Sequence, residues 1–390
     1  MNNPPHLADI RSRAREVLEE AWDDYRGYSF PNPHVYGHQW LWDSCFHAIA
    51  WAALGDHRAE RELGSVFVAQ LPNGFVPHMR YAEDTLERGP LPYASSYTQP
   101  PVYAHAARML VDAGLHVPPP LLSHIEHAFE YLWRSRRTAD GLLKIVHPWE
   151  AGADDSPRWD AWIGHGDWNR SEWTGFDLQL IQETVFAESG EATSSSRFEA
   201  APAAFNAIAA HGMAELHALT GSDVWLRRSI ELGDAIDGLL WDPDEGLWSD
   251  LALVGPAKTT ALPTLDGALP ALSTTDAHKA GRALDQFLEP ERFGAPYGLA
   301  YVARSHPAYR GDLYWRGAAW PQLNHLALVA ALRWQRHDLA REIEGMTRRA
   351  VTTSGFSELW DPVTGEARGA TPQTWAALAA VDITDQPETR

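Results

Sequence analysis

The sequence predicts an all-α protein whose helical hairpins pack into one closed ring rather than into two separate domains. Apolar residues recur mostly at helical spacing, and strand-like alternation is scarce. The chain of 390 residues has no long charged linker and no shift in composition that would mark a domain boundary. We therefore expect a single domain over residues 1–390, with active-site loops inserted near 74–99 and 146–173.

The expected helices follow one another along the chain, each justified by an apolar stripe with a period of about 3.6 residues. They cover residues 10–22, 42–53, 102–115, 121–133, 201–219, 224–240 and 314–332. Turns rich in Gly, Pro, Asn and Asp separate them at 31–33, 72–74, 118–120, 189–190, 242–246 and 290–296. The irregular stretches 74–99, 146–173 and 355–372 are where a helical scaffold would carry function.

Composition limits the partners and the compartment. The formal net charge of −20 argues against nucleic acid, whose binding needs a basic surface. No stretch of about 20 apolar residues indicates a membrane span, and the first residues do not resemble a signal peptide. The single cysteine, Cys45, fits a reducing compartment, so we expect a cytoplasmic protein. Composition leaves a homo-oligomer open.

Tryptophan is unusually frequent, and many copies stand beside acids and arginines. The chain has 18 Trp residues. Indole is rarely buried completely, since its N–H requires a partner, and its flat face suits the apolar side of a sugar ring. This composition favours a carbohydrate ligand.

A first chemical cluster begins a helix at residues 40–47, WLWDSCFH. Asp43 falls in the first helical turn, where the helix dipole favours a carboxylate that could accept two sugar hydroxyls while Trp40 or Trp42 stacks on the ring. The alternative is a helix N-terminal Asp with two core tryptophans. We interpret His47 as structural.

A second cluster, residues 147–160, reads HPWEAGADDSPRWD. Its prolines and glycine prevent a continuous helix and hold four carboxylates and two tryptophans on one loop. Crowding by aromatic rings and like charges could keep one carboxyl protonated, as glycoside hydrolysis requires. A solvated turn is the alternative. The spacing does not match a calcium loop.

Three further segments contribute candidates. Glu358 lies in the broken stretch 355–366, GFSELWDPVTGE, and could activate a water from across a cavity; taken alone, the stretch is more often just a loop. Arg316, in the segment 314–317, YWRG, could pair with a carboxylate or make a structural cation–π contact. Gln99, in 98–101, TQPP, could bind a ligand through its amide or simply precede a helix. Phosphate-loop, paired-cysteine zinc and His-Glu-x-x-His patterns are missing.

Together these segments resemble glycoside hydrolase family 63, specifically the mannosylglycerate and glucosylglycerate hydrolases. The family carries a WxWDSxFH helix start, a TQPP segment, an HPWESGxDNSPxWD loop, a YWRG segment and a late Glu followed by PxTGE. All five motifs occur here in the same order between residues 36 and 375. An ordered set of five is much more specific than any single motif.

The resemblance implies an (α/α)6 barrel and an inverting α-glycosidase. It implies Asp154 as the general acid and Glu358 as the general base, and no metal or organic cofactor. The sugar contacts that it implies are Tyr36, Trp40, Trp42, Asp43, Gln99, Trp149, Gly152, Trp315 and Arg316, with Gln373 and Trp375 as weaker candidates.

The sequence departs from the family pattern at several positions. Ala151 replaces the usual Ser, Asp155 replaces Asn, and the stretch 168–172 matches only in part. The loop over residues 74–97 is shorter than in family members. The cations available for a glycerate carboxylate are Arg80, Arg88 and Arg170.

We therefore expect an enzyme that hydrolyses a small α-glucoside or α-mannoside, such as glucosylglycerate or mannosylglycerate. An alternative is an exo-α-glucosidase that acts on an oligosaccharide or a natural-product glycoside. A sugar epimerase or isomerase using facing histidines and a non-catalytic sugar binder are further alternatives; the two acids in motif context disfavour the binder.

Overall fold

The computed structural model describes residues 7–82, 89–164, 169–255 and 262–382, and most of its regular structure is helical. The α-helices are α1 Leu7–Ala21, α2 Leu41–Ala53, α3 Arg58–Ser65, α4 Tyr103–Asp112, α5 Pro119–Tyr131, α6 Asp160–Ile163, α7 Arg170–Gln182, α8 Ala203–Thr220, α9 Asp223–Leu239, α10 Ala277–Asp285, α11 Tyr314–Gly317, α12 Pro321–Arg333 and α13 His337–Ser354. Short 3-10 helices add η1 Val66–Ala69, η3 Pro148–Ala151, η4 Pro157–Trp159, η5 Leu265–Gly267, η6 Leu269–Leu272 and η7 Thr374–Ala380, and a π-helical turn, η2 Leu132–Arg136, extends α5. The expected helix-rich fold is confirmed.

The strands are short and form two-stranded antiparallel ribbons rather than an extended sheet. The pairs are β1 Trp22–Asp23 with β2 Tyr28–Ser29, β3 Gln39–Trp40 with β4 Met79–Arg80, β5 Thr184–Phe186 with β6 Ala192–Ser195, β7 Glu199–Ala201 with β10 Leu251–Val254, β8 Trp241–Asp242 with β9 Leu247–Trp248, and β11 Leu359–Trp360 with β12 Ala367–Arg368. These ribbons stiffen the connections between helices, because each is fixed by its own ladder of backbone hydrogen bonds.

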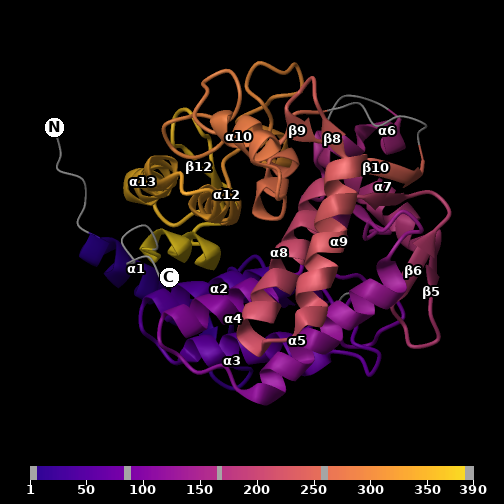
Figure 1. Cartoon of the computed structure of the whole chain (residues 1–390). Helices are drawn as coiled ribbons and strands as arrows, with labels where there is room; N and C mark the ends of the chain where they lie inside the picture. The colour runs from indigo at the N-terminus through magenta and orange to yellow at the C-terminus, as the bar shows by residue number, and fades with distance from the viewer. Residues whose placement is uncertain (1–6, 83–88, 165–168, 256–261, 383–390) are drawn as a thin grey trace.

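Helices that follow one another pack as hairpins, and successive hairpins lie side by side (Figure 1). α8 packs against α9, and α12 packs against α13. The first helix, α1, packs against η7 near the end of the described chain, so the two ends of the described chain meet. The apolar faces of these elements form one large buried cluster, which explains why the helices show a single apolar stripe.

One expected helix is wrong. The stretch 314–332 is divided between α11 and α12 rather than forming one helix. Pro321 begins α12, and the preceding Trp320 has an extended backbone, because the proline ring disfavours helical geometry in the residue before it. The break frees the segment that carries Trp315 to turn toward the pocket described below.

Among the described residues, no helix is both long and apolar enough to cross a membrane.

Candidate active site

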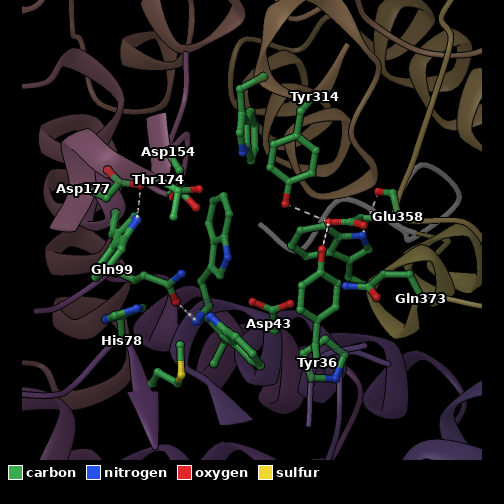
Figure 2. Close-up of a pocket in the computed structure, with 18 of the residues that line it drawn as sticks. Tyr36, Asp43, His78, Gln99, Asp154, Thr174, Asp177, Tyr314, Glu358 and Gln373 are labelled. Atoms are coloured by element: carbon green, nitrogen blue, oxygen red, sulfur yellow. Dashed lines mark hydrogen bonds between the residues drawn. The ribbon is translucent and has the colours of Figure 1, made fainter. Parts of the chain in front are cut away.

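A pocket of about 440 Å³ gathers nearly all of the predicted site residues. Figure 2 shows Asp154 and Asp177 on one side of it and Glu358 and Gln373 on the other, with Asp43 between them. The predicted residues that line it are Tyr36, Trp40, Trp42, Asp43, Gln99, Trp149, Gly152, Asp154, Trp315, Glu358, Gln373 and Trp375. Segments more than 300 residues apart in sequence therefore meet around one cavity.

Glu358 is held at the pocket wall by three hydrogen-bond donors. The Tyr36 and Tyr314 hydroxyls donate to Oε1 at 2.8 and 2.9 Å, and the Ala370 backbone N–H donates to Oε2 at 2.7 Å. Burial raises the pKa of Glu358 above its ordinary value, while the hydrogen bonds from Ala370, Tyr36 and Tyr314 act in the opposite direction. The three donors also fix the carboxylate in one orientation.

The backbone beside Glu358 requires a glycine. Gly369, directly after β12, has φ +67°, and a Cβ there would lie 2.3 Å from Glu358 Oε2. Only glycine adopts this backbone geometry without strain and leaves room for the carboxylate.

Asp43 lies in the first turn of α2 and faces the pocket from below (Figure 2). Its side chain is buried, and burial raises its pKa to about 7; the charge of Glu358 acts in the same direction, and His47 opposes it. Next to it, the Trp42 backbone N–H donates to Gln99 Oε1 at 3.3 Å. This bond fixes the amide of Gln99 against the start of α2.

The loop that carries Asp154 is anchored by a buried ion pair. Arg136 donates to both carboxylate oxygens of Glu150, at 2.9 and 2.7 Å, and both side chains are inaccessible to solvent. Glu150 also accepts backbone N–H bonds from Thr98 and Val146. Because every one of these groups is buried, the loop is tied firmly to both the Gln99 segment and η2.

The four carboxylates predicted on this loop therefore serve different purposes. Glu150 pairs with Arg136, Asp155 pairs with Arg170 at 3.1 Å, and Asp160 pairs with Arg316. Asp154 is the one of the four that lines the pocket. Gly152 lines it as well, with φ +76°, and a Cβ there would lie 2.6 Å from Trp42 Cη2.

Arg316 is the predicted contact residue that the structure does not bring to the pocket. It is buried, donates to both carboxylate oxygens of Asp160, in one case at 2.7 Å, and lies 5.7 Å from the ring centroid of Trp173. This structural ion pair and cation–π contact correspond to the alternative interpretation of the residue. The sequence does not reveal Asp160 as the partner, because the two residues are 156 positions apart.

Indole rings that pack against one another form part of the remaining wall, which includes Trp42, Trp315 and Trp375. Trp315 stacks on Trp320 with ring centroids 3.7 Å apart and an interplanar angle of 7°, and Trp42 lies 6.3 Å from Trp315 and 6.0 Å from Trp375. Trp375 Nε1 donates to the Glu358 backbone carbonyl at 2.9 Å. The aromatic wall and the Glu358 segment thus support each other.

A row of buried polar side chains holds the segment that carries Gln373 and Trp375. Between them in sequence, the Thr374 hydroxyl lies 2.6 Å from His47 Nε2, and His47 Nδ1 lies 3.4 Å from Glu62 Oε1. These contacts agree with the structural role expected for His47.

Apart from Arg170, which was a candidate cation, the wall contributed by α7 was not predicted. Its pocket-lining residues are Arg170, Thr174, Asp177, Leu178 and Ile181, which repeat at helical spacing on one face. Asp177 Oδ2 accepts a hydrogen bond from Trp149 Nε1 at 3.2 Å. The spacing was a usable signal, but the mixture of charged, hydroxyl and aliphatic side chains hides this face from a search for apolar periodicity.

The remaining lining residues that were not predicted are Pro31, His78, Met79 and Tyr314. Of the candidate cations for a carboxylate, Arg170 lines the pocket, with its guanidinium 5.3 Å from the Tyr314 ring centroid. Arg80 instead lies 4.9 Å from the Tyr28 ring centroid and does not line the pocket, and Arg88 lies outside the described residues.

Within the described part of the chain, the grouping of side chains that could hold a metal ion is His105, His211 and Glu215. None of the three lines the pocket. The pocket itself offers carboxylates on facing walls, a tyrosine-bound glutamate and aromatic surfaces, which are the groups that acid–base cleavage of a glycoside uses.

Comparison with known proteins agrees with this chemistry. A family model described as the mannosylglycerate hydrolase MGH1-like glycoside hydrolase domain matches residues 36–376. The chain therefore belongs to this family and is a glycoside hydrolase, which confirms the expectation from the motifs.

The chain also resembles individual hydrolases along nearly its whole length. The chain is 28% identical to a mannosylglycerate hydrolase of Rubrobacter radiotolerans, with 97% of each chain covered. It is 27% identical to a glucosylglycerate hydrolase of Mycolicibacterium hassiacum, covering 98% of this chain and 99% of that one. Among solved structures, a GH63 mannosylglycerate hydrolase from Thermus thermophilus, in complex with Tris and D-glycerate, matches with a TM-score of 0.80 and 26% identity, covering 95% of this chain and 99% of that one.

Proposed function

We propose that this protein is an inverting α-glycosidase in which Asp154 is the general acid and Glu358 the general base. The observation that carries the proposal is that these two carboxylates line one pocket from facing sides, with Asp43 between them (Figure 2). An inverting enzyme requires this opposition, because the proton donor and the attacking water act on opposite faces of the sugar.

In this mechanism, Asp154 donates its proton to the glycosidic oxygen as the bond to the anomeric carbon breaks. Glu358 accepts a proton from the water that attacks the anomeric carbon from the other side, and the products are the free aglycone and a sugar of inverted configuration. A separation of about 6.5 to 9.5 Å between the two carboxyls would accommodate that water.

The surroundings of Glu358 suit a base. A general base must be ionised before it can accept a proton, and Tyr36, Tyr314 and the Ala370 N–H all donate to the ionised carboxylate. The buried carboxyl of Asp43 is suited to accept hydroxyls of the bound sugar, and the indoles of Trp42 and Trp315 to cover the apolar face of its ring.

For the substrate, we propose an α-glucoside or α-mannoside of a small acid such as glycerate. The relatives are named for mannosylglycerate and glucosylglycerate, and one related structure contains D-glycerate. Arg170, which lines the pocket and pairs with Asp155 next to Asp154 in sequence, supplies a cation for a carboxylate on the leaving group. With a net charge of −20 over the chain, an anionic substrate would depend on this local cation.

The catalytic assignment is tested with an aryl α-glucoside and the variants Asp154→Asn and Glu358→Gln. Each variant should bind substrate but turn over slower by about a hundredfold or more, because one proton transfer is lost. Asp155→Asn is the matched control and should lose much less. Full activity in either of the first two variants would refute the assignment. Proton NMR of the sugar released immediately after mixing should show the inverted anomer.

The aglycone is tested by comparing α-glucosylglycerate, α-mannosylglycerate and aryl α-glucosides with the wild type and Arg170→Gln. The variant should lower kcat/KM for the glycerate compounds by about tenfold and leave the aryl substrate nearly unchanged. Cleavage of only the aryl compounds by the wild type would exclude glycerate.

A second candidate is a glycoside with an apolar aglycone, such as a natural product. Leu178, a pocket-lining residue, exposes 56% of its surface, and Ile181 lies one turn further along α7. Preference for apolar aglycones in the same panel would favour this candidate. The epimerase alternative would need facing histidines, and among the described residues that line the pocket His78 is the one histidine.

The finer architecture also remains a proposal. We infer an (α/α)6 barrel formed by a single domain over residues 1–390, supported by the hairpin order and by the contact of α1 with η7. Cytoplasmic location, a possible homo-oligomer and the lack of a nucleic-acid partner stay predictions from composition.

A further inference from the structure

Three buried histidines converge from three helices, outside the pocket lining. His105 lies on α4, His211 on α8 and His325 on α12. His105 Nε2 is 3.1 Å from His325 Nε2, and its other ring nitrogen, Nδ1, is 3.4 Å from His211 Nε2. His105 therefore stands at the centre of a chain of imidazoles.

A carboxylate completes the group on one side. Glu215 follows His211 by four positions on α8, so the two side chains share one face of the helix. His211 Nε2 lies 3.5 Å from Glu215 Oε1, and one ligand atom from each of His105, His211 and Glu215 lies within 4.8 Å of the others. Two nitrogens and one oxygen thus lie close enough together to be considered as one set of ligands.

We propose that His105, His211 and Glu215 bind a divalent transition-metal ion such as Zn²⁺, in a site separate from the catalytic pocket. Zn²⁺ bonds of about 2.0 to 2.1 Å in tetrahedral geometry place neighbouring ligand atoms about 3.3 Å apart. The separations of 3.4 and 3.5 Å from His211 Nε2 are close to that length. Water would fill the fourth position, as it does in other sites with two histidines and one glutamate.

His325 orients the central ligand. When His105 binds metal through Nδ1, its Nε2–H can donate to His325 Nε2 at 3.1 Å. A metal-binding histidine usually donates its other N–H to a neighbouring acceptor, and this bond fixes the tautomer and the ring orientation. The imidazole chain is therefore compatible with one metal ion at its His211 end.

The arginines near Glu215 have other partners. Arg108 and Arg333 act on Glu215 from α4 and α12, together with the carboxylate of Asp112. Arg108 pairs with Asp112 at 2.9 Å, and Arg333 donates to the Thr274 carbonyl at 3.3 Å. Among the described residues, neither arginine forms an ion pair with Glu215.

The metal would link helices rather than take part in cleavage. His325 contacts Phe46, with ring centroids 6.2 Å apart, and Phe46 contacts Trp42 at 5.9 Å, so an aromatic layer lies between the site and the pocket. A shared ion would join α4 to α8 and stabilise the folded state without contacting the sugar.

The test is a calorimetric titration of the chelator-treated, full-length protein with Zn²⁺ at pH 7.5, followed by the visible spectrum of the Co²⁺ complex. We expect one equivalent of tight binding, a Co²⁺ spectrum typical of four-coordinate nitrogen and oxygen ligation, and a higher Tm with Zn²⁺. Glu215→Gln and His211→Gln should each weaken binding by about tenfold or more. Asp112→Asn, a neighbouring carboxylate outside the ligand set, should leave affinity within about threefold.

Retained glycosidase activity in Glu215→Gln would show that this variant is folded. If the wild type binds no stoichiometric Zn²⁺, or if both ligand variants bind it as tightly as the wild type, the proposal is wrong and the group is a hydrogen-bonded imidazole chain. Neither result depends on the identity of the glycoside.

Discussion

Replacing Asp43 by Asn should change how the stability of this protein depends on pH. The pKa of the buried carboxyl rises from 3.8 to about 7 in the fold. Each pKa unit corresponds to about 1.4 kcal/mol, so ionising Asp43 in the folded chain costs about 4 kcal/mol more than in the unfolded chain. An asparagine of similar shape carries no such cost.

The raised pKa of Asp43 determines whether stability rises or falls with pH. Because the folded pKa is the higher one, the stabilising contribution of Asp43 is fully present below pH 3.8 and is lost as the pH rises through about 7. The Asn variant should therefore gain stability relative to the wild type between pH 4 and pH 8. For 390 residues, an unfolding entropy of about 2.1 cal/mol/K per residue gives about 0.8 kcal/mol/K, so the gain corresponds to about 5 °C in Tm.

The assay is Tm against pH for the wild type, Asp43→Asn and the control Asp140→Asn, whose side chain is exposed. The Tm difference between Asp43→Asn and the wild type should widen from pH 4 to pH 8, while the control curve stays parallel to the wild type. Parallel curves for Asp43→Asn would refute the link between its burial and its pKa. The variant should also bind sugar more weakly, because it loses a charged acceptor for hydroxyl groups.

Two further variants probe the pocket walls. Tyr36→Phe removes one hydrogen-bond donor to the ionised carboxylate of Glu358, so the pKa of Glu358 should rise. The acidic limb of the pH profile of kcat/KM should then move to higher pH. An unmoved limb would contradict the assignment of Glu358 as the base. Gly152→Ala places a Cβ 2.6 Å from Trp42 at φ +76° and should lower kcat/KM by about tenfold or more. Gly164→Ala is the control, since it shares a positive φ of +92° but has no atom of the other described residues within 4 Å of the added Cβ. Equal losses in both variants would assign the effect to backbone strain alone.

The site residues that could be predicted from the sequence are charged residues with unusual neighbours in the chain. Asp43 and Asp154 stand among tryptophans, prolines and glycines, and both line the pocket. The break before Pro321 also had a local signal, but the continuous apolar stripe across 314–332 outweighed it in the prediction.

Contacts between residues that are far apart in the chain could not be predicted from the sequence. Arg316 could be recognised as a charged group beside aromatic rings, but its partner Asp160 lies on a distant segment, so its structural role could not be distinguished from sugar contact. Likewise, α7 reaches the pocket through Thr174 and Asp177, which are ordinary on a solvent-exposed helix. Their place in the site depends on the docking of the whole helix, which no local pattern encodes.

The contact between α1 and η7 determines when the enzyme can become active during synthesis. The apolar face of α1, which includes Val17 and Leu18, leaves the ribosome long before η7, against which it packs. Glu358 and Trp375 are likewise made late relative to α1, and Trp375 belongs to η7 itself. Until η7 has been synthesised, a nascent chain therefore carries an uncovered α1 and an incomplete pocket, which makes α1 a natural place for a chaperone to bind.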